Sequence, residues 1–98
     1  MAKTIRVVAR IKSQPNTIDE TRAVLLGLID PTRSEAGCIR YELLQNNSDP
    51  TDFTFVEEWQ SDDALNQHLA SAHLAAASIK ASALLAEPPD IRRYSLVK

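Results

Sequence analysis

Cysteine is almost absent from this chain of 98 residues, in which Cys38 is the only one. A disulfide within the chain is therefore excluded, and we expect a reducing compartment and a cytoplasmic location. No Cys-x-x-Cys or zinc-type pattern surrounds Cys38. We interpret it as a small buried residue at the start of a strand, because free cysteines are usually buried.

Long apolar runs and an excess of one charge are also missing. No segment approaches the roughly 20 apolar residues of a membrane-spanning helix, and the N-terminus has no apolar run of signal-peptide length. The 11 basic and 13 acidic residues are interspersed, so the sequence has no basic stripe of the kind that binds nucleic acid. We therefore expect neither a membrane nor a nucleic acid as partner.

Hydrophobic residues are plentiful, at 44% of the chain, which is enough for a packed core. The length fits one domain, so residues 1–98 are expected to fold as a single unit. Because a short chain buries a smaller share of its surface, this core is only moderately stabilising. A second subunit that covers one face of the protein would add to it.

Alternation of apolar and polar residues predicts strands with one buried face. In the strand expected over residues 53–60, the third along the chain, Phe53, Phe55, Glu57 and Trp59 share a face. In the second, Cys38, Arg40 and Glu42 are expected on one face and Ile39, Tyr41 and Leu43 on the other. The four predicted strands cover residues 4–12, 38–45, 53–60 and 91–97. Turn-forming residues fill 46–52, which predicts a hairpin between the second and third strands.

Start and stop signals place two helical regions between these strands. Thr17 and Glu20 have the spacing of a capping box, so a helix should begin there. Pro31 is expected to end or kink it, and a further turn could continue to Ser34. Gly37 is a plausible stop signal.

The second helical region is predicted in two pieces. Ser61 or Asp62 caps the first piece, and Ser71 gives a second start signal. Seven alanines between residues 72 and 86 favour a helix to Ala86. Because alanines supply little volume, a cavity beneath this helix is expected. The resulting order, β-α-β-β-α-β, is that of a ferredoxin-like α+β fold.

Several short patterns resemble one known family in their order and spacing. Residues 35–41 read Glu-x-Gly-Cys-x-x-Tyr, residues 53–59 end in Glu-x-Trp, and residues 68–73 read His-x-x-Ser-x-His. The first strand, including 7–11, also fits. Together they resemble the antibiotic biosynthesis monooxygenase family, which includes small quinol monooxygenases, over nearly the whole chain.

This resemblance implies a homodimer whose two sheets meet through their open faces as a dimeric α+β barrel. It also implies a cavity between each sheet and its helices. Many members oxygenate electron-rich phenols or quinols without metal or flavin, so no cofactor is expected and the partners would be a small aromatic substrate and dioxygen. Other members are isomerases, and one branch degrades haem.

Five side chains are candidates for the site. His68 or His73 could act as the base at neutral pH, because a histidine titrates there. Tyr41 could hydrogen-bond a phenolate, and Trp59 could wall the pocket and donate its ring N–H. Glu57 lies on an apolar face, where a carboxylate needs a partner; we favour an arginine of the same or the other subunit over a role as base.

Two further chemistries are not expected. The two histidines lie five residues apart, about 140° around a continuous helix, whereas a chelating pair prefers a spacing of four, and no third metal ligand is evident. The haem-degrading branch uses an Asn in its first strand, and residues 4–12 contain none. Its Trp and His positions align here with His68 and Ser78.

Three functions remain open. The preferred one is a cofactor-independent monooxygenase that oxidises a quinol or polyphenol-type molecule. The second is an isomerase of a small enolisable carbonyl compound, which would use the same base to move a proton. The third is a non-catalytic dimeric binding module in which the histidines brace the helix on the sheet.

Overall fold

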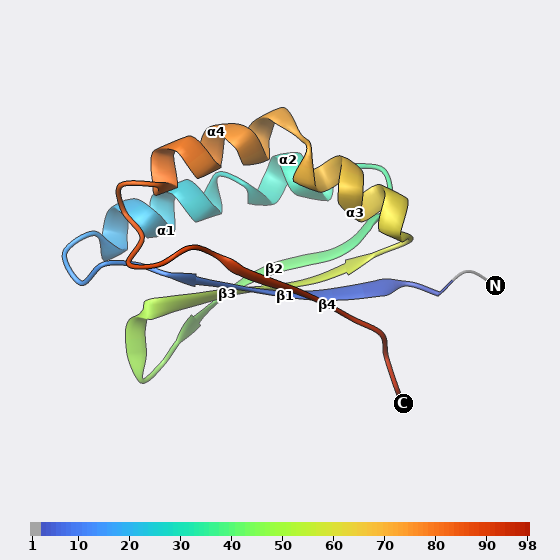
Figure 1. Ribbon diagram of the computed structural model, residues 1–98, viewed down its shortest axis with the longest axis horizontal. Helices are drawn as coiled ribbons and strands as arrows, with labels where there is room; N and C mark the ends of the chain where they lie inside the picture. The colour runs from blue at the N-terminus through green and yellow to red at the C-terminus, as the bar shows by residue number, and fades with distance from the viewer. Residues whose placement is uncertain (1–2) are drawn as a thin grey trace.

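A four-stranded antiparallel sheet carries all the helices on one of its faces, in a computed structural model that describes residues 3–98 (Figure 1). The strand order is β2-β3-β1-β4. The ferredoxin-like α+β fold is confirmed, with both helical regions split in two. The elements are β1 (Ile5–Lys12), α1 (Ile18–Leu26), α2 (Ile29–Arg33), β2 (Cys38–Asn46), β3 (Asp49–Trp59), α3 (Asp62–Leu69), α4 (Ala72–Ala81) and β4 (Asp90–Tyr94). No helix in this part of the chain is long and apolar enough to cross a membrane.

The core lies between the sheet and the helices, as the alternation of β1 and β3 predicts. Val7 pairs with Glu57 and Ala9 pairs with Phe55, so these side chains point to the same, helix-covered face. All four are buried there, and the helices add Leu25, Leu28 and Leu65.

The start of β2 departs from the predicted alternation. Cys38 pairs with Trp59 and Arg40 pairs with Glu58, so Ile39 is an extra residue in a bulge. Cys38 therefore packs against the core, on the same face as Tyr41, whereas Ile39 is 49% exposed. The prediction had placed Ile39, not Cys38, on the face of Tyr41. The two residues have exchanged faces because a bulge shifts the alternation by one residue.

The hairpin between β2 and β3 is tighter than predicted. β2 continues to Asn46 and β3 begins at Asp49, four residues before the expected start. The Asn46 side chain accepts the Ser48 N–H (2.8 Å), which closes the turn. Lys12 on β1 donates to the Asp49 carboxylate (2.7 Å), so the lengthened strand is held by its neighbour.

The first helical region breaks before the proline rather than at it. α1 ends at Leu26, Gly27 follows as its C-cap, and Pro31 lies in the first turn of α2. A proline is tolerated there because the N–H that it lacks would have no partner within the helix. The helix begins where the capping-box spacing predicts, with Thr17 at the N-cap position. The capping bond itself is not formed, because the Thr17 hydroxyl caps no helix N–H and instead donates to the Leu84 carbonyl (2.7 Å).

The second helical region has both predicted caps but ends early. Ser61 accepts the Ala64 N–H and Ser71 accepts the Leu74 N–H. α4 ends at Ala81 rather than Ala86. The backbone beyond it bonds to the end of β1 instead, with the Ala86 N–H donating to the Lys12 carbonyl (2.8 Å). β4 then spans Asp90–Tyr94, shorter than the expected strand over residues 91–97.

Candidate functional site

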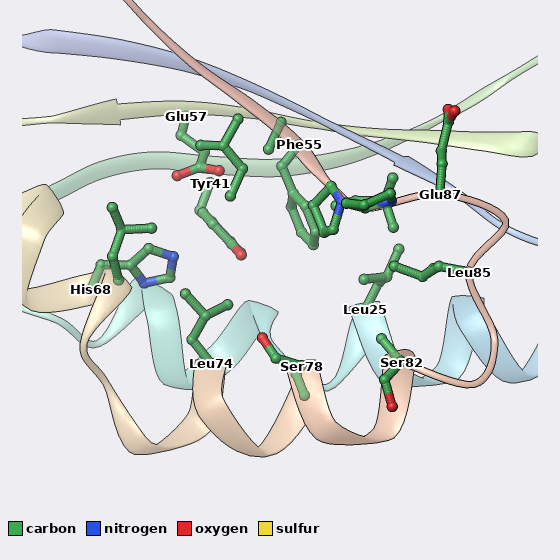
Figure 2. Close-up of a pocket in the computed structure, with 18 of the residues that line it drawn as sticks. Leu25, Tyr41, Phe55, Glu57, His68, Leu74, Ser78, Ser82, Leu85 and Glu87 are labelled. Atoms are coloured by element: carbon green, nitrogen blue, oxygen red, sulfur yellow. The ribbon is translucent and has the colours of Figure 1, made fainter.

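A cavity of about 550 Å³ lies between the sheet and α4. Most of its lining is apolar, and Ala77 and Ala81 of the alanine-rich helix form part of its wall. Small side chains on α4 therefore leave open space above the sheet, as predicted. Figure 2 shows Glu57, Tyr41 and His68 at one end of this cavity and Leu85 and Glu87 at the other.

Tyr41 reaches the cavity from β2. Its ring stacks on Phe55 with 4.7 Å between the centroids, and its hydroxyl points into the cavity (Figure 2). Burial raises the pKa of Tyr41 above its ordinary value, and the nearby Glu57 carboxyl adds to the shift. The hydroxyl therefore stays protonated at neutral pH and offers an O–H donor.

His68 is buried on the sheet-facing side of α3 and is only 2% exposed. Its ring stacks on Trp59 (4.7 Å between centroids, planes 29° apart) and meets Tyr41 edge-on at 5.5 Å. Nδ1 lies 2.7 Å from Oε2 of Glu35. The other ring nitrogen, Nε2, has no hydrogen-bond partner among residues 3–98. His68 thus brings an imidazole to the cavity with one nitrogen engaged behind it.

Glu35 links the two histidines, a role that the sequence analysis missed. Its Oε2 lies 2.7 Å from Nδ1 of His68 and 2.8 Å from Nε2 of His73. The break between α3 and α4 at Ser71 lets both imidazoles reach this one oxygen. The only sequence signal was that Glu35 opens the Glu-x-Gly-Cys-x-x-Tyr pattern.

His73 lies outside the cavity. Its side chain is 26% exposed, and its Nε2 is also 3.3 Å from the Ser71 hydroxyl. The two histidines that the sequence left as equal candidates are therefore in different places. Only His68 lines the cavity.

Trp59 also lies outside the cavity, directly behind His68. It is fully buried, and its Nε1–H donates to Oε1 of Glu57 (2.9 Å). The ring N–H predicted to serve a substrate is therefore already engaged. Trp59 walls the site indirectly, by packing against His68.

Glu57 does line the cavity, and within the described chain its partner is not the expected arginine; an arginine of the other subunit stays a prediction. No arginine among residues 3–98 contacts it, and the Trp59 N–H donates to it instead. Burial raises the pKa of Glu57 to about 7; the Trp59 hydrogen bond opposes this shift and the Glu35 charge adds to it. Glu57 can therefore exchange a proton near neutral pH.

Among residues 3–98, the side chains of Glu35, His68 and His73 form a group whose atoms could hold a metal ion. Their candidate ligand atoms all lie within 4.8 Å of one another, so the third ligand that the sequence did not reveal is present. The two nitrogen–oxygen distances of 2.7 and 2.8 Å are those of hydrogen bonds. Atoms bound to one tetrahedral zinc ion are roughly 3.3 Å apart, so both imidazoles would first have to move away from the Glu35 oxygen.

Comparison with known proteins places these features in a family. A sequence model of the antibiotic biosynthesis monooxygenase family matches residues 4–78. A Synechocystis relative is 32% identical over 94 residues, 96% of this chain, and the chain spans only 64% of that relative's length. A Mycobacterium tuberculosis relative named "Putative monooxygenase Rv0793" is 32% identical over 90% of this chain and 86% of its own.

Solved structures agree with the sequence matches. A Pseudomonas aeruginosa crystal structure superposes with a TM-score of 0.93 at 30% identity, covering all of this chain and 98% of that one. The structure of the Mycobacterium tuberculosis relative gives 0.91 at 27% identity, covering 97% and 96%. With the family model matched across three of the four strands, the chain belongs to the antibiotic biosynthesis monooxygenase family.

Proposed function

We propose that this protein is a cofactor-independent monooxygenase that oxidises a quinol or polyphenol-type small molecule with dioxygen. One observation carries the proposal: a largely apolar cavity holds His68, Tyr41 and Glu57 together at one end. The family and the names of two relatives support monooxygenase-like chemistry. The choice of substrate rests on the cavity, because an apolar space with a few polar groups suits an aromatic ring that carries hydroxyls.

The first step of such a reaction is removal of a phenolic proton. His68 is the proposed base, because it lines the cavity and its Nε2 has no protein partner among residues 3–98. The electron-rich anion that results can then reduce dioxygen. His73 is set aside as the base, because it does not reach the cavity.

The overall reaction balances without a reductant. A quinol and one dioxygen give a hydroxyquinone and one water; one oxygen atom forms a bond to a ring carbon and the other leaves as water. All four electrons come from the quinol. The Tyr41 O–H and a protonated Glu57 can donate to the oxygen atoms on which negative charge develops, in a cavity whose lining is largely apolar.

Oxygen uptake tests this assignment. Wild-type protein should consume dioxygen with hydroquinones in the absence of added metal and flavin. The His68→Ala variant should lose about 10²- to 10⁴-fold in kcat, the range for a general base. His73→Ala should lose less, and Gln67→Ala, an exposed neighbour on α3, should match the wild type. No uptake by the wild type, or full activity in His68→Ala, would refute the proposal.

An isomerase of a small enolisable carbonyl compound is the second candidate. One observation favours it: a carboxyl group with a pKa of about 7 and an imidazole face the same cavity. Such a pair can donate a proton at one position and remove it at another. Turnover of a carbonyl compound under anaerobic conditions would support this candidate against the oxygenase, since an isomerase needs no oxygen.

We also propose that the protein is a homodimer formed through the sheet face opposite the helices. Val8 on β1 pairs with Val56 on β3 at the centre of that face. Ion pairs such as Arg6 with Glu58 flank them. A face with an apolar centre and a charged rim is typical of a protein interface.

A further inference from the structure

The hydrogen bonds behind the cavity determine which ring nitrogens of His68 and His73 carry a hydrogen. The Ser71 hydroxyl has a single hydrogen, which it donates to the His68 carbonyl at 2.7 Å. Its oxygen therefore acts only as an acceptor toward its other neighbours, the Leu74 N–H and Nε2 of His73. Nε2 of His73 consequently carries a hydrogen.

The same reasoning extends to His68. Oε2 of Glu35 accepts the His73 Nε2–H at 2.8 Å, and an ionised carboxylate can only accept. The second short contact of this oxygen, 2.7 Å to Nδ1 of His68, then needs a hydrogen on Nδ1. A neutral His68 that carries its hydrogen on Nδ1 has a free lone pair on Nε2.

The surroundings of Glu35 hold its carboxylate in place as a hydrogen-bond acceptor for His68. Its side chain is 17% exposed, and it does not line the cavity. It stands two residues before Gly37, whose φ of 89° sets the turn into β2. Across the site, the Trp59 ring stacks on His68 and restricts the rotation of the imidazole. The orientation of the His68 imidazole and the nitrogen that carries its hydrogen are thus both set by residues outside the cavity.

We propose that Glu35 is a positioning residue that holds His68 in the Nδ1–H tautomer, so that the Nε2 lone pair serves the cavity. His73, whose Nε2 also contacts the Ser71 hydroxyl, keeps the Glu35 carboxylate in place. The tautomer follows from the hydrogen bonds alone, whereas its catalytic consequence rests on the proposed function. A carboxylate bound to one ring nitrogen selects the tautomer and orients the other nitrogen.

Nitrogen-15 NMR of the imidazole rings tests the tautomer without any substrate. The chain has only two histidines, so a His73→Gln variant assigns both spectra. Spectra recorded across the neutral and alkaline range should show neutral His68 with its hydrogen on Nδ1. They should show His73 with a hydrogen on Nε2. A neutral His68 that carries its hydrogen on Nε2, or a His68 that keeps both hydrogens throughout, overturns the proposal.

Variants then separate positioning from a merely structural role. Glu35→Ala should shift His68 mainly to the Nε2–H tautomer, and Glu35→Gln should shift it less, because an amide oxygen still accepts. Glu87→Gln, the same change at the opposite end of the cavity, is the matched control and should leave His68 unchanged. If Glu35→Ala does not fold, the wild-type and Glu35→Gln spectra still decide.

Kinetics provide the second readout. Glu35→Ala should lower kcat about 10²-fold and change KM by no more than about twofold, because Glu35 does not contact the cavity. Absent oxygen uptake together with the expected tautomer would refute the proposed function alone. Wild-type kcat and an unchanged tautomer in Glu35→Ala would refute the positioning role alone.

Discussion

At the scale of single residues, Glu57 is the most unusual placement in the protein. Its carboxyl group is buried on a face otherwise formed by Phe55, Trp59 and other apolar side chains. One N–H from Trp59 offsets part of the loss of water around it. Burial still dominates, so the pKa of Glu57 is about 7 rather than 4.5.

This shift predicts a pH dependence of stability. Between pH 4.5 and 7 the folded state binds more protons at Glu57 than the unfolded state does, so the free energy of unfolding should fall as the pH rises. The Glu57→Gln variant lacks this contribution while keeping an acceptor for Trp59. Relative to the wild type, it should gain about 3 kcal/mol between pH 4.5 and 7.5, measured by urea unfolding. Because other groups titrate in both proteins, parallel curves would contradict the prediction.

At the scale of elements, the connection from α2 to β2 depends on Gly37. Its φ is 89°, a left-handed conformation that favours glycine, and a Cβ added there would lie 2.6 Å from Cβ of Ala64. This close approach lets α3 pack beside the turn that carries Glu35. Gly27, by contrast, has a helical φ of −64°, and a Cβ added there would make only ordinary van der Waals contacts, 3.4 Å from the Val24 carbonyl oxygen and 3.6 Å from that of Ala23.

The two glycines should therefore respond in opposite ways to alanine. Gly37→Ala should reduce the free energy of unfolding by about 2 kcal/mol or more, through backbone strain and the clash with Ala64. Gly27→Ala should be neutral or stabilise by up to about 1 kcal/mol, because alanine restricts the unfolded chain. Urea unfolding followed by circular dichroism measures both. Equal effects at the two positions would show that neither strain nor contact distinguishes them.

At the scale of the whole molecule, the two faces of the sheet differ. The helices cover one face and leave the other bare (Figure 1). On the bare face Val8 and Val56 are neighbours and only partly exposed, with Leu44 about half exposed beyond them. The proposed homodimer would bury these side chains.

A charge at the centre of this face should prevent that association. We expect a wild-type dimer and a Val8→Glu monomer in sedimentation experiments at micromolar concentration, because removing the glutamate charge from water is costly even with Arg92 paired opposite it across β1 and β4. Ile79→Glu, on the 76% exposed position of α4, is the control and should remain dimeric. A monomeric wild type, or a dimeric Val8→Glu, would exclude this face as the interface.

The sequence predicted the fold well where the signal is local. Alternation placed Phe53, Phe55 and Glu57 on the buried face, and the caps Ser61 and Ser71 were found from residue type and spacing. Predictions failed where distant segments compete for the same groups. Thr17 bonds to Leu84 instead of capping its helix, and α4 ends early because the following backbone bonds to β1.

The candidate site shows the same difference between local signals and contacts between distant segments. The sequence by itself determined that Glu57 lies on the buried face of its strand and that His68 and His73 lie in the second helical region, because alternation and helix caps are local signals. Only the tertiary structure decided which of them meet. Glu35 lies 33 positions from His68 and 38 from His73, yet one oxygen bonds both. Contacts between residues this far apart depend on how helices pack on the sheet, and no local pattern records that packing.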